Sequence, residues 1–254
     1  MKISFQTLAL PALLIAATAS LSACGGKGLS LPFGSFRVVN GISDSSSLDA
    51  KATNLPSDIN NITVNTAAGF RSVPDGSFKL NLTVHSGNNQ LGFSLDNVSI
   101  STNDETTAYF PGKITDGSYN TNGFQVKNPV GSIGTGMVEI QPVHAASNVP
   151  TAISLYINAP TDATITGTPI NVAYKTGVTP SQISSGSYRL RVTAQGSTVV
   201  IFDSGTTGIP LAASARLQIA VLNQTDATGA SLRIFLLLIP SDGSAPVAVA
   251  NVLP

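Results

Sequence analysis

Pro74–Thr83 reads PDGSFKLNLT, a turn dipeptide followed by an alternating strand. Apolar Phe78, Leu80 and Leu82 are separated by single polar residues, and a period of two is typical of a strand with one buried and one wet face. Ser184–Thr193 reads SSGSYRLRVT and repeats the same pattern 110 positions later (184 − 74). A strand pattern that occurs twice at this distance predicts a chain built from two similar β units.

The rest of the chain supports this interpretation. The two units also open alike, with Val39–Asp44 (VNGISD) corresponding to Val143–Asn148 (VHAASN). No stretch after the N-terminal region sustains helical periodicity, and the apolar run Ile234–Ile239 has the length of a central strand buried on both faces.

We therefore predict an all-β fold with two tandem immunoglobulin-like β-sandwich domains after a lipoprotein signal peptide. The first would span residues 35–127 and the second residues 137–254, joined by a linker of Pro and Gly residues at 128–136. The chain has one cysteine and no tryptophan, so it lacks the cysteine pair and core tryptophan of antibody domains. The likeness is therefore to the sandwich architecture alone.

Both units resemble a bacterial family of domains of unknown function, numbered 4397. The family pattern has an apolar strand with Val-Asn/His-Ala-Ser-Pro, and later a Gly-Ser/Thr-Tyr turn that enters a long alternating strand. The first unit carries it at Arg37–Asp44 and Val73–Phe78, and the second at Pro142–Pro150 and Ile183–Tyr188. Both units lack the proline that follows the first serine in the family, so we expect a different opening turn. The resemblance covers nearly all of residues 35–254 and implies a cell-surface lipoprotein with no agreed activity.

The N-terminal region is typical of an exported lipoprotein. Residues 1–23 contain Lys2 and then the apolar stretch Leu8–Ala17, which is shorter than the roughly 20 residues that span a bilayer. Leu21-Ser22-Ala23-Cys24 resembles the bacterial lipobox, in which the chain is cut between Ala23 and Cys24. The thiol of Cys24 would then carry the lipid, including palmitate, and Cys24 is the only cysteine in the chain.

Residues 24–34 would form a lipidated, glycine-rich tether between membrane and first domain. Because several acyl chains anchor a protein stably, we expect the membrane to be a permanent partner. Gly25 follows the cysteine where an aspartate would retain such a lipoprotein in the inner membrane. The predicted location is therefore the bacterial cell envelope, at the outer membrane where the host has one. An ordinary secretory signal with a chance cysteine is the alternative.

The composition argues against nucleic acid as a partner. Only 10% of residues are charged, against about 25% in an average globular protein. Loss of Lys2 with the signal leaves 12 basic and 13 acidic residues, a net charge of −1. Nucleic-acid binders normally show a clustered basic face, whereas the basic residues here are scattered.

One motif has the pattern of a catalytic site. Val199–Thr206 (VVIFDSGT) resembles the aspartic-protease signature, an apolar strand that delivers Asp-Ser/Thr-Gly-Ser/Thr. That chemistry needs two aspartates that share a proton, yet Ser94 stands opposite Asp203 in the first unit. A second aspartate could come only from a second molecule. The alternative, which we prefer, is a solvated Asp-Ser-Gly turn at the end of a strand.

Metal and cofactor sites are not predicted. The two histidines, His85 and His144, fall in different units, and the sequence has no paired-cysteine or His-x-x-x-His spacing. His144 occupies the Asn/His position of the family, where Asn40 stands in the first unit, so we expect both side chains to hydrogen-bond their turn. Asp44 and Asp49 lack the dense Asp-x-Asp pattern of a calcium loop. The Gly-rich segment 131–136 precedes a strand, not the helix that a dinucleotide loop needs.

These observations predict a non-enzymatic envelope lipoprotein that acts as a structural or interaction module. Its partners would be the membrane through the lipid and an envelope protein or glycan, with no cofactor and no nucleic acid. Two alternatives stay open. One is a carbohydrate- or peptidoglycan-binding lipoprotein, which the absence of tryptophan weakens, and the other is a dimeric aspartic protease that uses Asp203.

Overall fold

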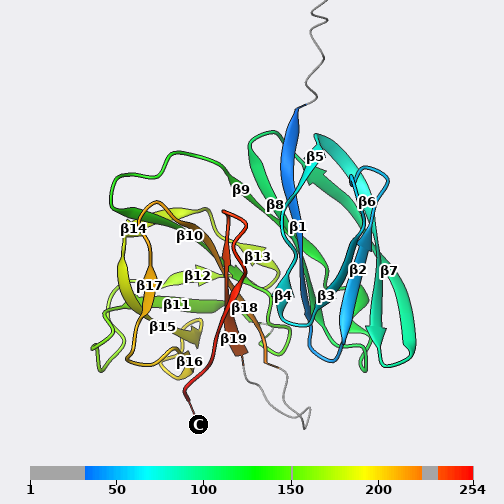
Figure 1. Cartoon of the computed structure of the whole chain (residues 1–254). Helices are drawn as coiled ribbons and strands as arrows, with labels where there is room; N and C mark the ends of the chain where they lie inside the picture. Colours follow the sequence, from blue (N-terminus) through cyan, green and yellow to red (C-terminus); the bar gives the residue numbers. More distant parts are fainter. Residues whose placement is uncertain (1–31, 150, 225–233, 254) are drawn as a thin grey trace, which may run out of the picture. The chain divides into compact units, whose positions relative to one another are not determined.

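A computed structural model describes residues 32–149, 151–224 and 234–253 of the chain. The predicted all-β class is confirmed, since these residues form strands and one short 3-10 helix, η1 (Ser118–Asn120). The described residues all belong to one compact unit that begins at Pro32. Figure 1 shows the strands coloured along the sequence. Their bounds are β1 Phe33–Ile42, β2 Ser47–Lys51, β3 Ile59–Thr63, β4 Thr66–Ala67, β5 Arg71–Pro74, β6 Gly76–Ser86, β7 Asn89–Ile100, β8 Asp104–Gly112, β9 Phe124–Pro129, β10 Met137–His144, β11 Ile153–Asn158, β12 Ile170–Val172, β13 Thr176–Gly177, β14 Ser181–Ser184, β15 Gly186–Ala194, β16 Val200–Asp203, β17 Ile209–Leu211, β18 Arg216–Asn223, β19 Ile234–Pro240 and β20 Val247–Val249.

The first half of the unit is a two-layer sandwich. One sheet has the order β4-β1-β8-β9, with β5 also paired to β1, and the other has the order β3-β2-β6-β7. Phe78, Leu80 and Leu82 of β6 all point into the core between the sheets, as their alternation predicts. Phe78 packs edge-on against Phe36 of β1, with ring centroids 5.6 Å apart. The stretch Pro74–Thr83 therefore supplies part of the inner face of this sandwich.

The second half repeats these pairings. Its sheets have the orders β13-β10-β18-β19-β20, with β14 on β10, and β12-β11-β15-β16, with β17 on β15. In each half the first strand pairs in parallel with a late strand, so that Asn40 lies beside Phe110 and His144 beside Val221. Immunoglobulin sheets instead have the strand orders A-B-E-D and C-F-G. The likeness to that fold is thus one of two-layer architecture and not of strand order.

A third apolar cluster joins the two halves. It is built from the outer faces of the sheets that contain β1 and β10, and its buried members are Val39, Tyr109, Val126, Val143, Ala145, Ala220, Leu222, Phe235, Leu237 and Ile239. In β19, Phe235, Leu237 and Ile239 face this cluster, whereas Ile234, Leu236 and Leu238 face the core of the second sandwich. The continuous apolar run is therefore a strand buried on both faces, as predicted.

Buried polar side chains cross the same interface. The side-chain oxygen of Gln218, on β18, accepts hydrogen bonds from Tyr109 Oη at 2.9 Å, Thr107 Oγ1 at 2.9 Å and Arg37 Nη2 at 3.1 Å. Its amide nitrogen donates to Gln141 Oε1 at 2.8 Å. Burial lowers the pKa of Arg37 to about 10, against the opposing charges of Tyr109 and Glu105. Buried polar groups are tolerated when they are fully paired, so this network fixes how the halves meet.

The structure adjusts one predicted boundary. Strand β9 runs to Pro129 and buries Asn128, so the connection begins two residues later than the predicted linker. The segment that follows is held to the second half, because Gln182 donates to Ser132 O and accepts from Gly134 N. Strand β10 begins at Met137, where the second unit was predicted to begin. Independent folding of the two halves stays a prediction, and the shared cluster implies that separating them costs stability.

Candidate functional site

The predicted lipid site lies outside the described residues. The first described residue is Pro32. The predicted signal, with Ala23 at its end, Cys24 and most of the tether all precede it. Lipidation and cleavage at these residues therefore stay predictions.

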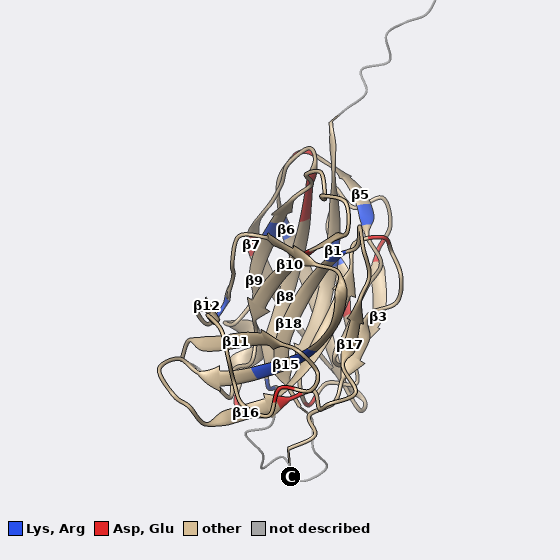
Figure 2. Cartoon of the chain, turned by 90° about the vertical axis from the view of Figure 1, so that its left-hand side faces the viewer, with Lys and Arg blue, Asp and Glu red and all other residues tan. Residues whose placement is uncertain are grey.

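Asp203 ends strand β16, and its neighbours are basic. β16 pairs with β15 so that Asp203 lies beside Arg191, and the corresponding pair in the first half is Ser94 beside Asn81. The Asp203 carboxylate accepts from Arg189 Nε at 2.8 Å and Arg189 Nη2 at 2.6 Å, and from Arg191 Nε at 3.3 Å. Figure 2 shows the basic segment of β15 next to the acidic end of β16.

The prediction that Asp203 is a solvated turn residue is wrong. Only 5% of the residue is exposed, and Arg191 is 2% exposed. As the alternation in β15 predicts, Arg189 and Arg191 lie on the opposite face of the strand from the apolar residues. That face was expected to be exposed to solvent, but the loop that follows β11 covers it. Arg191 donates to the backbone oxygens of Asp162 and Thr164 in that loop, and to the side-chain oxygen of Asn158.

This arrangement disfavours protease chemistry at Asp203. Desolvation by burial pushes the pKa of Asp203 upwards, but hydrogen bonds from Arg189 and the Gly205 N–H, with the charges of Arg189 and Arg191, outweigh it and lower the pKa. A dyad carboxylate must instead hold a shared proton. The carboxylate already accepts four hydrogen bonds, so it works as the centre of an ion-pair cluster between strand and loop.

A pocket of about 570 Å³ lies over this cluster. Its wall includes Tyr156, Thr164 and Thr166, together with Arg189. The strands that carry this cluster, β15 and β16, lie at the end of the unit opposite the start of β1, near the C-terminal segment (Figure 1).

His144 and Asn40 have the same role in the two halves, as the sequence predicts. Asn40 accepts from the Ile42 N–H at 3.1 Å and donates to Ile62 O at 2.9 Å. His144 Nδ1 accepts from the Ala146 N–H at 3.4 Å, and Nε2 lies 2.9 Å from both Val149 O and Thr151 O. These partners require a neutral ring protonated at Nε2. Each side chain therefore ties its strand to the turn that follows.

Stability should fall in mild acid through His144. The ring is fully buried, and desolvation lowers its pKa from the ordinary 6.5 against the hydrogen bonds to Thr151 and Val149. The unfolded chain therefore takes up a proton first as the pH falls below about 6.5, and this favours unfolding. Urea unfolding of wild type and His144→Asn should show that the variant has lost this part of the pH dependence between about pH 5 and 7. Equal slopes in both proteins would refute the assignment.

The remaining acidic candidates make structural contacts, Asp44 to a loop and Asp49 to neighbouring strands. Asp44 accepts from the Ile114 N–H at 2.6 Å and the Thr115 N–H at 3.0 Å. Asp49 lies 3.0 Å from His85 Nε2 and accepts from the Asn61 N–H at 2.7 Å. In the part of the chain that the structure describes, no group of three or more His, Cys, Asp or Glu side chains gathers as a metal ion would require. Across the same ranges no helix is long and apolar enough to cross a bilayer.

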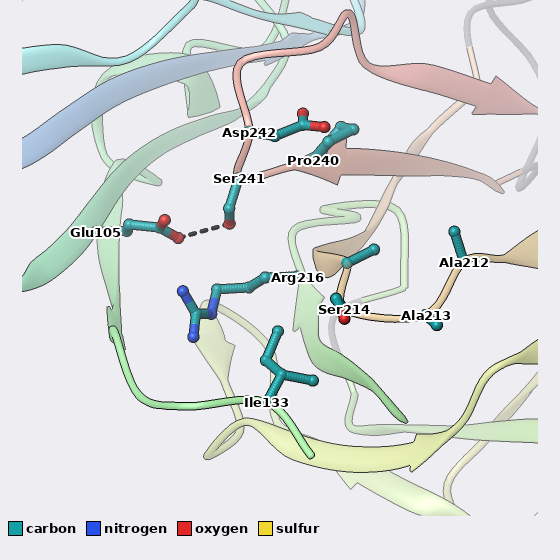
Figure 3. Close-up of a pocket in the computed structure, with 10 residues that line it drawn as sticks. Glu105, Ile133, Ala212, Ala213, Ser214, Arg216, Pro240, Ser241 and Asp242 are labelled. Atoms are coloured by element: carbon teal, nitrogen blue, oxygen red, sulfur yellow. Dashed lines mark hydrogen bonds between the residues drawn. The ribbon is translucent and has the colours of Figure 1, made fainter. Parts of the chain in front are cut away.

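Sequence reasoning missed a second pocket, at the junction of the two halves. It has a volume of about 420 Å³ and combines Glu105 of β8 with Arg216 of β18 (Figure 3). Glu105 Oε2 accepts from Ser241 Oγ at 2.6 Å and Asn128 Nδ2 at 3.3 Å. Desolvation by burial raises the pKa of Glu105 in spite of these bonds and of the charges of Arg37 and Arg216. The one available signal was that Glu105 and Glu139, the only glutamates in the sequence, each stand at the start of a strand.

Comparison with models of known protein families finds no match for this chain, and a search of curated proteins finds no significantly similar sequence. The resemblance to the family numbered 4397 therefore stays a prediction.

Proposed function

We propose that the chain is a lipoprotein of the bacterial cell envelope, attached through Cys24 and acting as a non-enzymatic interaction module. The observation that carries the proposal is the position of the lone cysteine. It closes the lipobox Leu21–Cys24 directly after the apolar stretch, and the compact unit begins shortly afterwards at Pro32. A lipid at this position would hold the unit close to the membrane by its first strand.

The geometry of the unit supports an interaction role. Strand β1 starts at one end, whereas the loops beside β16 and the C-terminal segment lie at the other (Figure 1). A chain tethered before β1 would present these loops away from its point of attachment, and binding sites are commonly built on such loops. The one motif with a catalytic pattern has its carboxylate held by Arg189 and Arg191. These two features together favour a module that binds over one that catalyses.

Membrane attachment should depend on the cysteine alone. We expect the mature chain with Cys24→Ser, exported behind an ordinary secretory signal peptide, to appear in the soluble envelope fraction. The reason is that the variant would carry no acyl chains, whereas stable anchoring takes more than one acyl chain or an equivalent second signal. The wild type should sediment with membranes and resist extraction by salt, and Ser22→Ala, which keeps a small residue before the cut, should do the same. Equal sedimentation of the Cys24→Ser variant and the wild type would contradict the proposal.

A further inference from the structure

The pocket at the junction presents two opposite charges to one space. Figure 3 shows the Glu105 carboxylate and the Arg216 guanidinium turned toward one another, the first from β8 and the second from the start of β18. Among the described residues no ion pair joins them, so the distance between them exceeds direct contact, although each affects the electrostatics of the other. The space between them is therefore open to a molecule that touches both.

Each charged group keeps one atom without a described partner. Glu105 uses Oε2 for Ser241 and Asn128, and no described residue bonds its second oxygen. Arg216 uses Nε for Glu139 and Nη2 for the Gly131 carbonyl oxygen, which leaves Nη1. Neither of these two atoms is among the fully buried unpaired atoms of the described residues, so a molecule in the pocket can reach both.

Both groups are also held in place before any ligand arrives. Glu105 is 7% exposed, and the side chain of Arg216 is 11% exposed. Their bonds to Ser241, Asn128 and Glu139 come from different segments and restrict rotation. A site whose charges are fixed in advance loses little conformational entropy on binding.

The rest of the wall is made mostly of small side chains, which favours a small ligand. Ile133, Ala213, Ala215 and Pro240 line the pocket beside the charged pair, with Asp242 at its edge. The volume, about 420 Å³, lies near the lower end of the range for ligand pockets, roughly 300 to 1,000 Å³. The two acidic residues of the wall, Glu105 and Asp242, outnumber its one basic residue, Arg216, so a simple anion such as phosphate would be repelled.

We propose that this pocket binds a free α-amino acid with a small side chain. Its ammonium group would donate to the unused oxygen of Glu105, and its carboxylate would accept from Nη1 of Arg216. The side chain would then contact Ile133 and the alanines. The inference gives the proposed interaction module a ligand class, but it does not depend on the lipid anchor.

Binding can be measured by isothermal titration of the full-length protein in detergent with glycine, L-alanine, D-alanine and L-serine. We expect saturable binding of at least one of them, with a matching rise in Tm. The N-acetyl and amide derivatives of the best ligand each lack one charge and should bind about 10- to 100-fold more weakly. No saturable binding, or equal binding of the blocked derivatives, would overturn the proposal.

Two variants locate the site. Glu105→Gln retains the hydrogen bonds to Ser241 and Asn128 but removes the charge, and it should weaken binding about 10- to 100-fold. Ala213→Phe fills the pocket from an exposed position, so it should abolish binding with little effect on the fold. Asp58→Asn makes the same charge change at an exposed ion pair with Lys51 and should leave binding unchanged. Unchanged binding in both pocket variants would refute this site, whereas membrane attachment is read separately through Cys24.

Discussion

Gln218→Ala is expected to lower the free energy of unfolding by about 3 to 5 kcal/mol, a large effect for a single substitution. Gln218 is fully buried, and its side-chain oxygen accepts from Arg37, Thr107 and Tyr109. Alanine would leave these three donors buried without that acceptor and would open a cavity between the halves. Each buried donor left without its acceptor costs about 1 to 3 kcal/mol, and more where the donor is charged.

Urea unfolding followed by circular dichroism measures this change. Gln90→Ala is the matched control, because Gln90 is exposed on β7 and should change stability by less than about 0.5 kcal/mol. A loss below about 1 kcal/mol in Gln218→Ala would mean that the network does not fix the junction between the halves.

Asp203→Asn should destabilise the protein by about 2 to 4 kcal/mol at neutral pH, because Arg189 and Arg191 lose the only carboxylate that pairs with them among the described residues. The amide is nearly isosteric, so the change reports the charge and not the packing. Asp96→Asn removes the carboxylate from an exposed pair with Lys79 and should cost at most about 0.5 kcal/mol. A cost for Asp203→Asn as small as that of the control would show that the cluster is not structural.

The Asp203 effect should disappear in acid. The pKa of Asp203 in the folded chain lies below its ordinary 3.8. Desolvation by burial would raise it, but the hydrogen bonds and the charges of the two arginines outweigh that effect. Between these two values the unfolded chain binds more protons, so stability falls as the pH falls. The difference between wild type and Asp203→Asn should be complete above about pH 5 and should shrink below about pH 4. A difference that is constant down to about pH 2.5, in a chain still folded there, would contradict the lowered pKa.

Much of the fold follows from local patterns in the sequence. Phe78, Leu80 and Leu82 face the core because alternating side chains of a strand lie on opposite faces. Ile234–Ile239 is continuously apolar because both faces of β19 are covered. The shared role of Asn40 and His144 was also predictable, since two copies of one turn place different side chains in one position.

The features that depend on contacts between distant segments were not predictable. The alternation of Arg189 and Arg191 with apolar residues says that they share a face, but it does not say that the loop after β11 covers that face. The polar face of β15 was therefore expected to be wet, and Asp203 with it. Glu105 and Arg216 are 111 residues apart (216 − 105), and only the packing of the sheet that contains β8 against the sheet that contains β18 brings them to one pocket.

The central proposal is attachment through a lipid on Cys24, and mass spectrometry of the N-terminal peptide from the membrane-bound protein tests it most directly. The proposal predicts that cleavage after Ala23 produces a mature chain that begins at Cys24 and carries a diacylglyceryl group on the sulfur. Treatment that hydrolyses the ester-linked acyl chains should reduce the mass by the mass of those chains. A mature chain that begins at another residue, or that begins at an unmodified Cys24, would contradict the proposal.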